Sequence, residues 1–173
     1  KTNDAWNGVM DTFDIIAKYN YNANDPLVGN TELDGQAMAK GDVAMWFMGD
    51  WGWSYLESVA NADDEYGIMP CPLTASADDA VNQELAVFPA KGYCVDGSQN
   101  DEAQQAAGKK LVEYLTIEIA QDMSDSLSIA LPFKNVDVTV ASPLANATQA
   151  YVADGKVQST YAFSALLPSD FWS

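Results

Sequence analysis

The feature that most constrains the fold of this chain is a short apolar run, DVAMWFM, at residues 42–48. Gly41 precedes the run, and Gly49 and Asp50 form a turn sequence directly after it. The run is far shorter than the ~20 residues that a membrane-spanning helix needs. After Asp42 it is continuously apolar, which is typical of a strand buried on both faces. A strand of this kind needs helices on both sides, so the run favours an α/β fold.

Segments with helical spacing alternate with such short runs along the whole chain. Near the N-terminus, apolar residues recur every three or four positions over 5–17, which predicts a helix. Gly41 is the residue type that ends a helix, and Ser142-Pro143 is the pair that begins one. The expected helices are 5–17, 33–40, 51–60, a segment from Ser98 or Asn100 to 116, 117–127 and 143–154.

The expected strands are 42–48, 66–72 and one or two segments within 85–97. Strands that alternate with helices are the pattern of α/β proteins. The small, polar and acidic segment 73–83 is expected to be a mobile loop, and it is the candidate internal boundary.

The charge balance restricts the class of partner. The chain carries 25 acidic residues, 8 lysines, no arginine and no histidine, for a net charge of −17. Such a chain repels phosphate backbones and anionic membrane surfaces, so nucleic acid is not expected as a partner. It also lacks the guanidinium fork that binds carboxylates and phosphates. A bound ligand is therefore expected to be neutral or cationic, and the acidity itself favours solubility.

Cysteine and acidic residues give no sign of a metal or cofactor site. Cys71 and Cys94 are not in a metal-type spacing, and they could either pair or remain reduced and buried. The acidic turns at 63–65 and 78–79 do not match a calcium-binding loop. We expect neither a metal nor a cofactor.

An ordered series of segments resembles the family 1 extracellular solute-binding proteins of sugar ABC transporters, whose members include maltose- and oligosaccharide-binding proteins. The series covers nearly the whole chain but only the later half of a full family member. Cys71 and Cys94 depart from the family pattern. The segments are AMAKGDVAMWFMGDWGWSYL (37–56), YGIMPCPL (66–73), KGYCVDGSQNDEAQQAAGKKLVEYLT (91–116), SIALPFKNV (128–136), SPLANATQAYVADGKV (142–157) and the closing Asp-Phe-Trp.

The resemblance implies a type II periplasmic-binding-protein-like fold, an α/β fold with two lobes around a ligand cleft, present here as a partial chain. Residues 1–84 and 138–173 would belong to the C-terminal lobe and 85–137 to the N-terminal lobe. The implied function is the capture of a neutral sugar or oligosaccharide for the membrane subunits of an ABC importer. The implied location is extracellular or periplasmic, with a lipidated N-terminus outside this chain. The segment is not expected to insert into a membrane or to be an enzyme.

The family places a stacking tryptophan in the loop that corresponds to 49–51. A sugar ring has an apolar C–H face that an aromatic ring can cover, and hydroxyls that polar groups can recognise. Trp51 is therefore the leading candidate for sugar stacking, although a tryptophan also packs readily in a core. Asp50 would accept hydrogen bonds from sugar hydroxyls, cap the following helix, or do both.

The remaining candidates lie elsewhere in the chain. Trp172, together with Phe171, matches a position where relatives place a second stacking aromatic residue, and core packing is the alternative. Phe88 lies where relatives cross between lobes and is expected in the cleft wall or hinge. The residues expected in the core are Trp6, Phe13, Met38, Met45, Trp46, Met48 and Trp53.

Two other classes of function are weighed against sugar binding. A glycoside hydrolase needs two carboxylates facing each other across a sugar, and the sequence nominates only Asp50. An adhesive cell-surface domain would use the same acidity and tryptophans for a protein contact.

Overall fold

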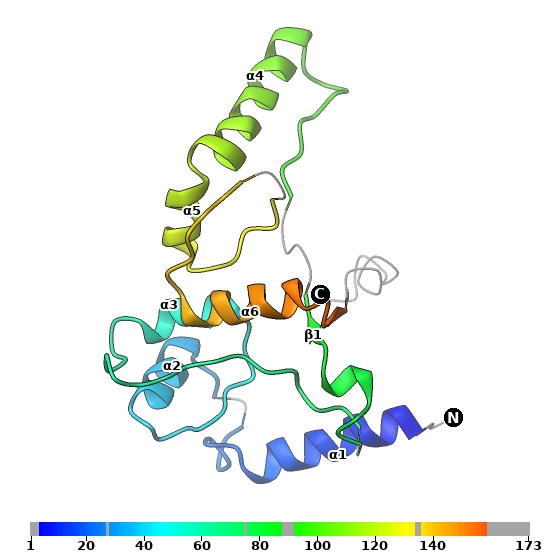
Figure 1. Cartoon of the computed structure of the whole chain (residues 1–173), viewed down its shortest axis with the longest axis vertical. Coiled ribbons are helices and arrows are strands. Elements are labelled where there is room, and N and C mark those ends of the chain that lie inside the picture. Colours follow the sequence, from blue (N-terminus) through cyan, green and yellow to red (C-terminus); the bar gives the residue numbers. More distant parts are fainter. Residues whose placement is uncertain (1–3, 27, 75, 88–91, 134–135, 159–173) are drawn as a thin grey trace.

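A computed structural model of the chain describes residues 4–26, 28–74, 76–87, 92–133 and 136–158, and it is mainly helical with one small parallel sheet (Figure 1). The mixture of helices and sheet agrees with the α/β expectation only in this coarse sense, and the two-lobed type II fold stays a prediction. The elements are α1 (Asp4–Lys18), α2 (Thr31–Ala39), the 3-10 turn η1 (Asp50–Gly52), α3 (Trp53–Leu56), the 3-10 turn η2 (Ala80–Asn82), β1 (Leu85–Ala86), α4 (Glu102–Glu113), the π-helical turn η3 (Tyr114–Glu118), α5 (Ala120–Leu127), α6 (Pro143–Ala153) and β2 (Val157–Gln158).

The helices fall into two groups. Helices α1, α2, α3 and α6 lie together at one end of the molecule, whereas α4, η3 and α5 form an arm that extends away from them (Figure 1). Strands β1 and β2 pair in parallel, with Leu85 opposite Val157. The sheet therefore joins the chain entering the arm to the chain that has returned from it. The lobe boundaries expected after residues 84 and 137 stay predictions.

Local sequence signals explain where most helices begin and end. The side chain of Asn30 caps α2 by accepting hydrogen bonds from the N–H groups of Glu32 and Leu33. Gly41 follows α2 with a φ of +79°, a left-handed conformation that glycine adopts without strain. Ser142 caps α6 through Ala145, and Pro143 is its first residue, as predicted.

Two predicted strands are wrong. Segments 42–48 and 66–72 are irregular, and β1 and β2 are the two strands of the described part of the chain. A strand is stabilised by the ladder that it forms with a neighbour, and no described strand lies beside either segment. Met45 and Phe47 are consequently 78% and 81% exposed, and the prediction that Met45 fills a core gap is also wrong.

A small core lies between α2, α3 and α6. Ala39, Leu56 and Leu144 form its buried centre. The partly buried residues packed around that centre are Met38, Trp46, Trp53 and Tyr66. Edge-to-face contacts pair Trp46 with Tyr55 at 6.3 Å and Trp53 with Tyr66 at 5.6 Å between ring centroids. These contacts agree with the core role expected for both tryptophans.

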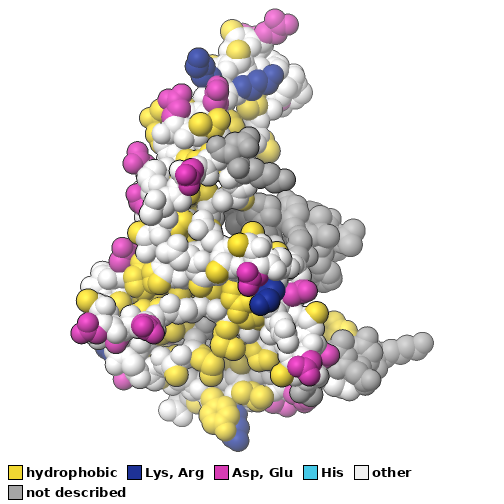
Figure 2. All heavy atoms as spheres, viewed as in Figure 1, with side chains coloured by type: hydrophobic (Ala, Val, Ile, Leu, Met, Phe, Trp, Pro, Cys, Tyr) yellow, Lys and Arg dark blue, Asp and Glu magenta, His cyan; other side chains and the backbone are white. Residues whose placement is uncertain are grey.

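The apolar residues of α1 do not enter this core. Trp6 is 59% exposed and Phe13 is 60% exposed, so the expectation that they are core residues is wrong. Helical periodicity identifies an apolar face but not the element that covers it. Hydrophobic side chains accordingly gather on the visible surface around α1, α2 and α6 (Figure 2).

Side-chain hydrogen bonds link the described residues of the acidic segment 73–83, and the mobility expected of this loop stays a prediction. Asn82 accepts from the N–H groups of Leu73 and Thr74 at 2.7 and 3.2 Å. The Asn82 amide also donates to the carbonyl of Ser76 at 2.7 Å, and Thr74 donates to Asp79 at 2.6 Å. An asparagine that bonds its neighbours in this way replaces missing secondary structure.

Candidate functional site

The leading site candidates lie in a tight turn at the start of α3. The N–H of Gly52 donates to the carbonyl of Gly49 at 2.9 Å, which closes η1. The single helix expected over 51–60 is instead divided into η1 and the one-turn helix α3. The N-cap position of α3 is Gly52, so Asp50 does not cap that helix as the sequence suggested it could.

Trp51 is partly exposed in this turn. Its side chain retains 46% of its possible exposure, and the outer carbons of its six-membered ring lie against the backbone of Gly49. The turn itself packs against α6. An indole that is supported on one side and partly exposed has the geometry that stacking needs, while its role as a sugar ligand stays a prediction.

Asp50 is half-buried beside this indole. Burial raises the pKa of its carboxyl group, because a charged group loses hydration when it leaves water. Hydrogen bonds from the backbone N–H groups of Ala130, Trp51 and Asp50 itself oppose that rise. The ion pair found among the described residues joins Lys156 to Asp154, so no described lysine pairs with Asp50.

The carboxylate of Asp50 lies close to the backbone N–H of Ala130, which belongs to a distant part of the chain. Ala130 follows α5, and a left-handed turn at Ser128, with φ of +54°, redirects the chain there. Asp50 thus lies where the turn at the start of α3 comes near the segment returning from the arm. A carboxylate has about four acceptor positions. Acceptor positions that the neighbouring backbone N–H groups leave free can accept from a hydroxyl group of a ligand.

Three other predicted site residues cannot be placed. Phe88, Phe171 and Trp172 lie outside the described residues. The site that the structure does bring together therefore consists of Trp51, Asp50 and two groups that the sequence analysis did not nominate, Gly49 and the backbone of Ala130. Gly49 lies next to the nominated residues, but nothing in the sequence indicated the contact with Ala130.

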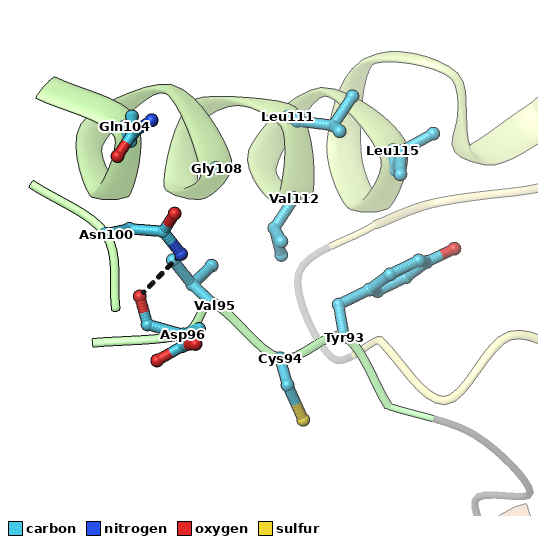
Figure 3. Close-up of a pocket in the computed structure, with 10 residues that line it drawn as sticks. All are labelled: Tyr93, Cys94, Val95, Asp96, Asn100, Gln104, Gly108, Leu111, Val112 and Leu115. Atoms are coloured by element: carbon cyan, nitrogen blue, oxygen red, sulfur yellow. Dashed lines mark hydrogen bonds between the residues drawn. The ribbon is translucent and has the colours of Figure 1, made fainter. Parts of the chain in front are cut away.

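Two hollows occur away from Trp51. The first, of about 270 Å³, lies between α4 and the extended segment 93–96. Figure 3 shows Val112 of α4 pointing toward that segment, with Val95 and Tyr93 facing the helix. The second, of about 290 Å³, lies between α2 and the turns before it and includes Tyr21, Asp34 and Lys40. Trp51 lines neither hollow.

Cys71 is half-buried and Cys94 is exposed, and both are free thiols. Burial raises the pKa of the Cys71 thiol, which disfavours the reactive thiolate. Within the described ranges, no group of three or more cysteine or acidic side chains is arranged to hold a metal ion. None of the described helices is both long and apolar enough to cross a membrane.

A scan against models of protein families and searches of curated proteins and of solved structures each found no match to this chain.

Proposed function

We propose that this chain binds a neutral sugar or short oligosaccharide outside the membrane and delivers it to an ABC importer. The observation that carries the proposal is that one turn holds both a partly exposed indole, that of Trp51, and a half-buried carboxylate, that of Asp50. The resemblance of the surrounding sequence to sugar-binding proteins supports the same assignment. The absence of arginine and histidine in the sequence favours a neutral ligand over an anionic one.

The two side chains divide the recognition between them. The indole of Trp51 covers the C–H face of a sugar ring, which removes apolar surface from water at ~25 cal/mol per Å². Asp50 accepts a hydrogen bond from a hydroxyl at the rim of the ring. A carboxylate that is already held by backbone donors rejects a ring that lacks this hydroxyl, because its remaining acceptor position would stay unsatisfied.

The position of the site suggests how binding is signalled. The Asp50 carboxylate lies close to the backbone of Ala130, so a sugar on Trp51 lies next to the junction between the arm and the helices around α6. In the proposed mechanism the sugar favours a closed arrangement of two lobes, and the importer recognises that arrangement.

The test is calorimetric titration of the full-length protein with a panel of neutral mono- to tetrasaccharides. Trp51→Ala is expected to weaken binding by ~1–3 kcal/mol, the usual result of removing an aromatic anchor. Trp6→Ala is the matched control, since Trp6 is also exposed but lies on α1, and it should leave affinity unchanged.

Three results would overturn the proposal. If Trp51→Ala binds sugar as tightly as the wild type, Trp51 is not the stacking residue. Absence of any sugar binding by the wild type, together with tight binding to a host protein, would favour an adhesive domain. Turnover of an oligosaccharide that Asp50→Ala abolishes would instead indicate a glycoside hydrolase.

A further inference from the structure

Gly49 has no conformational reason to be glycine. Its φ of −89° and ψ of −178° lie in the extended region that every L-amino acid adopts. Its structural role in the turn is the carbonyl that accepts from Gly52, and any residue provides a carbonyl. The choice of glycine must therefore come from the space around its α-carbon.

That space is occupied by the indole of Trp51. A β-carbon built on Gly49 would overlap three adjacent ring carbons of Trp51, namely Cε3, Cζ3 and Cη2. At Gly67, in contrast, a β-carbon would meet no described atom within 4 Å. The ring thus folds back onto the backbone at Gly49, in the space that a β-carbon would fill.

We infer that Gly49 is a positioning residue that fixes the orientation of the Trp51 indole for ligand stacking. This inference rests on the proposed function, because it assigns a role within the same site. A ring supported by the backbone on one side presents its other side to a ligand. Asp50 directly precedes Trp51 in the turn, so moving the ring changes its angle to the carboxylate. Gly49 therefore sets the spacing between the Trp51 indole, which stacks on the sugar, and the Asp50 carboxylate, which accepts from its hydroxyl.

The experiment is a double-mutant cycle in the full-length protein, with maltotriose as the neutral sugar and acrylamide as a fluorescence quencher. The variants are Gly49→Ala, Trp51→Ala and the double mutant, with Gly67→Ala as the matched control. Maltotriose affinity is measured by calorimetry. Acrylamide quenching is measured without ligand. The quenching of Trp51 itself is the difference between the wild type and Trp51→Ala, and in the Gly49→Ala background it is the difference between Gly49→Ala and the double mutant.

A positioning role predicts a non-additive cycle. Gly49→Ala should weaken maltotriose binding by about 5- to 150-fold, the loss expected when an aromatic anchor is misplaced. It should cause no further loss once Trp51 is absent. It should also change the quenching of Trp51, whereas Gly67→Ala should change neither property.

The outcomes separate the inference from the proposed function. If Trp51→Ala weakens binding but Gly49→Ala changes neither affinity nor quenching, the inference fails and the function stands. If the wild type does not bind maltotriose or Trp51→Ala has no effect, the sugar site fails, and the quenching data alone decide the role of Gly49. If Gly49→Ala does not fold, the double mutant should fold, because it lacks the overlapping ring. A double mutant that also fails to fold would contradict the inference.

Discussion

The surroundings of two helical glycines predict opposite effects of a glycine-to-alanine substitution on stability. Gly35 is buried in α2, and a β-carbon there would lie 2.8 Å from Cβ and 3.0 Å from the backbone oxygen of Tyr55. Neither atom is at the end of a flexible side chain, so Gly35→Ala must push α2 and α3 apart. Gly108 lies in α4, where a β-carbon would meet the methyl groups of Val95 at 3.1 and 3.4 Å. Those methyl groups can rotate or shift.

Helix propensity and overpacking compete at both sites, and their magnitudes decide the outcome. Replacing a helical glycine by alanine stabilises a helix by ~1 kcal/mol. Overpacking against a rigid neighbour costs about 1–3 kcal/mol. Gly35→Ala should therefore lower the free energy of unfolding by about 0–2 kcal/mol, and Gly108→Ala should raise it by about 0–1 kcal/mol.

Urea unfolding followed by circular dichroism measures both variants. A difference of ~1 kcal/mol corresponds to about 2–4 °C in Tm for a chain of this size. An increase in stability of ~1 kcal/mol for Gly35→Ala, equal to the full gain in helix propensity, would refute the reasoning, because α2 and α3 would then not be in contact at Gly35.

Two further predictions concern Asp50 and Asn82. Burial raises the pKa of Asp50 in the folded protein above its ordinary value of 3.8, so the folded state binds more protons than the unfolded state between those two values. The free energy of unfolding should therefore fall as pH rises through this window. Asp50→Asn should flatten this decline, measured by urea unfolding between pH 3 and about 7, and should also weaken sugar binding. An unchanged pH dependence in this variant would contradict the burial of the carboxyl group. Asn82→Ala should lower the free energy of unfolding by about 1–3 kcal/mol, since it leaves the N–H groups of Leu73 and Thr74 without their acceptor. It should also speed proteolysis within 73–83, and wild-type resistance in this variant would contradict the role of Asn82.

The helices could be predicted from the sequence because their signals are local. Asn30, Gly41 and Ser142-Pro143 act on the backbone within four residues of themselves. The start of α4 was predicted at Ser98 or Asn100, whereas the N-cap is Asp101, which forms the capping box with Gln104. The strands could not be predicted in the same way. Whether 42–48 forms a strand depends on a partner that its own residues do not encode.

In the candidate site, too, the features with local sequence signals could be predicted and those that depend on distant segments could not. The exposure expected of Trp51 follows from a turn that the sequence Gly49-Asp50 already indicates. The proximity of Ala130 to Asp50 depends on how the chain returns from α5, which no local pattern reports. The two-lobed fold and the sugar specificity rest on the family resemblance and stay predictions.

The most direct test of the stacking role of Trp51 is a crystal structure of the full-length protein grown with a neutral oligosaccharide that binds it. We predict a sugar ring lying flat on the free side of the indole, with one hydroxyl donating to the carboxylate of Asp50. A sugar bound elsewhere, with the same indole enclosed by aliphatic side chains, would contradict the account.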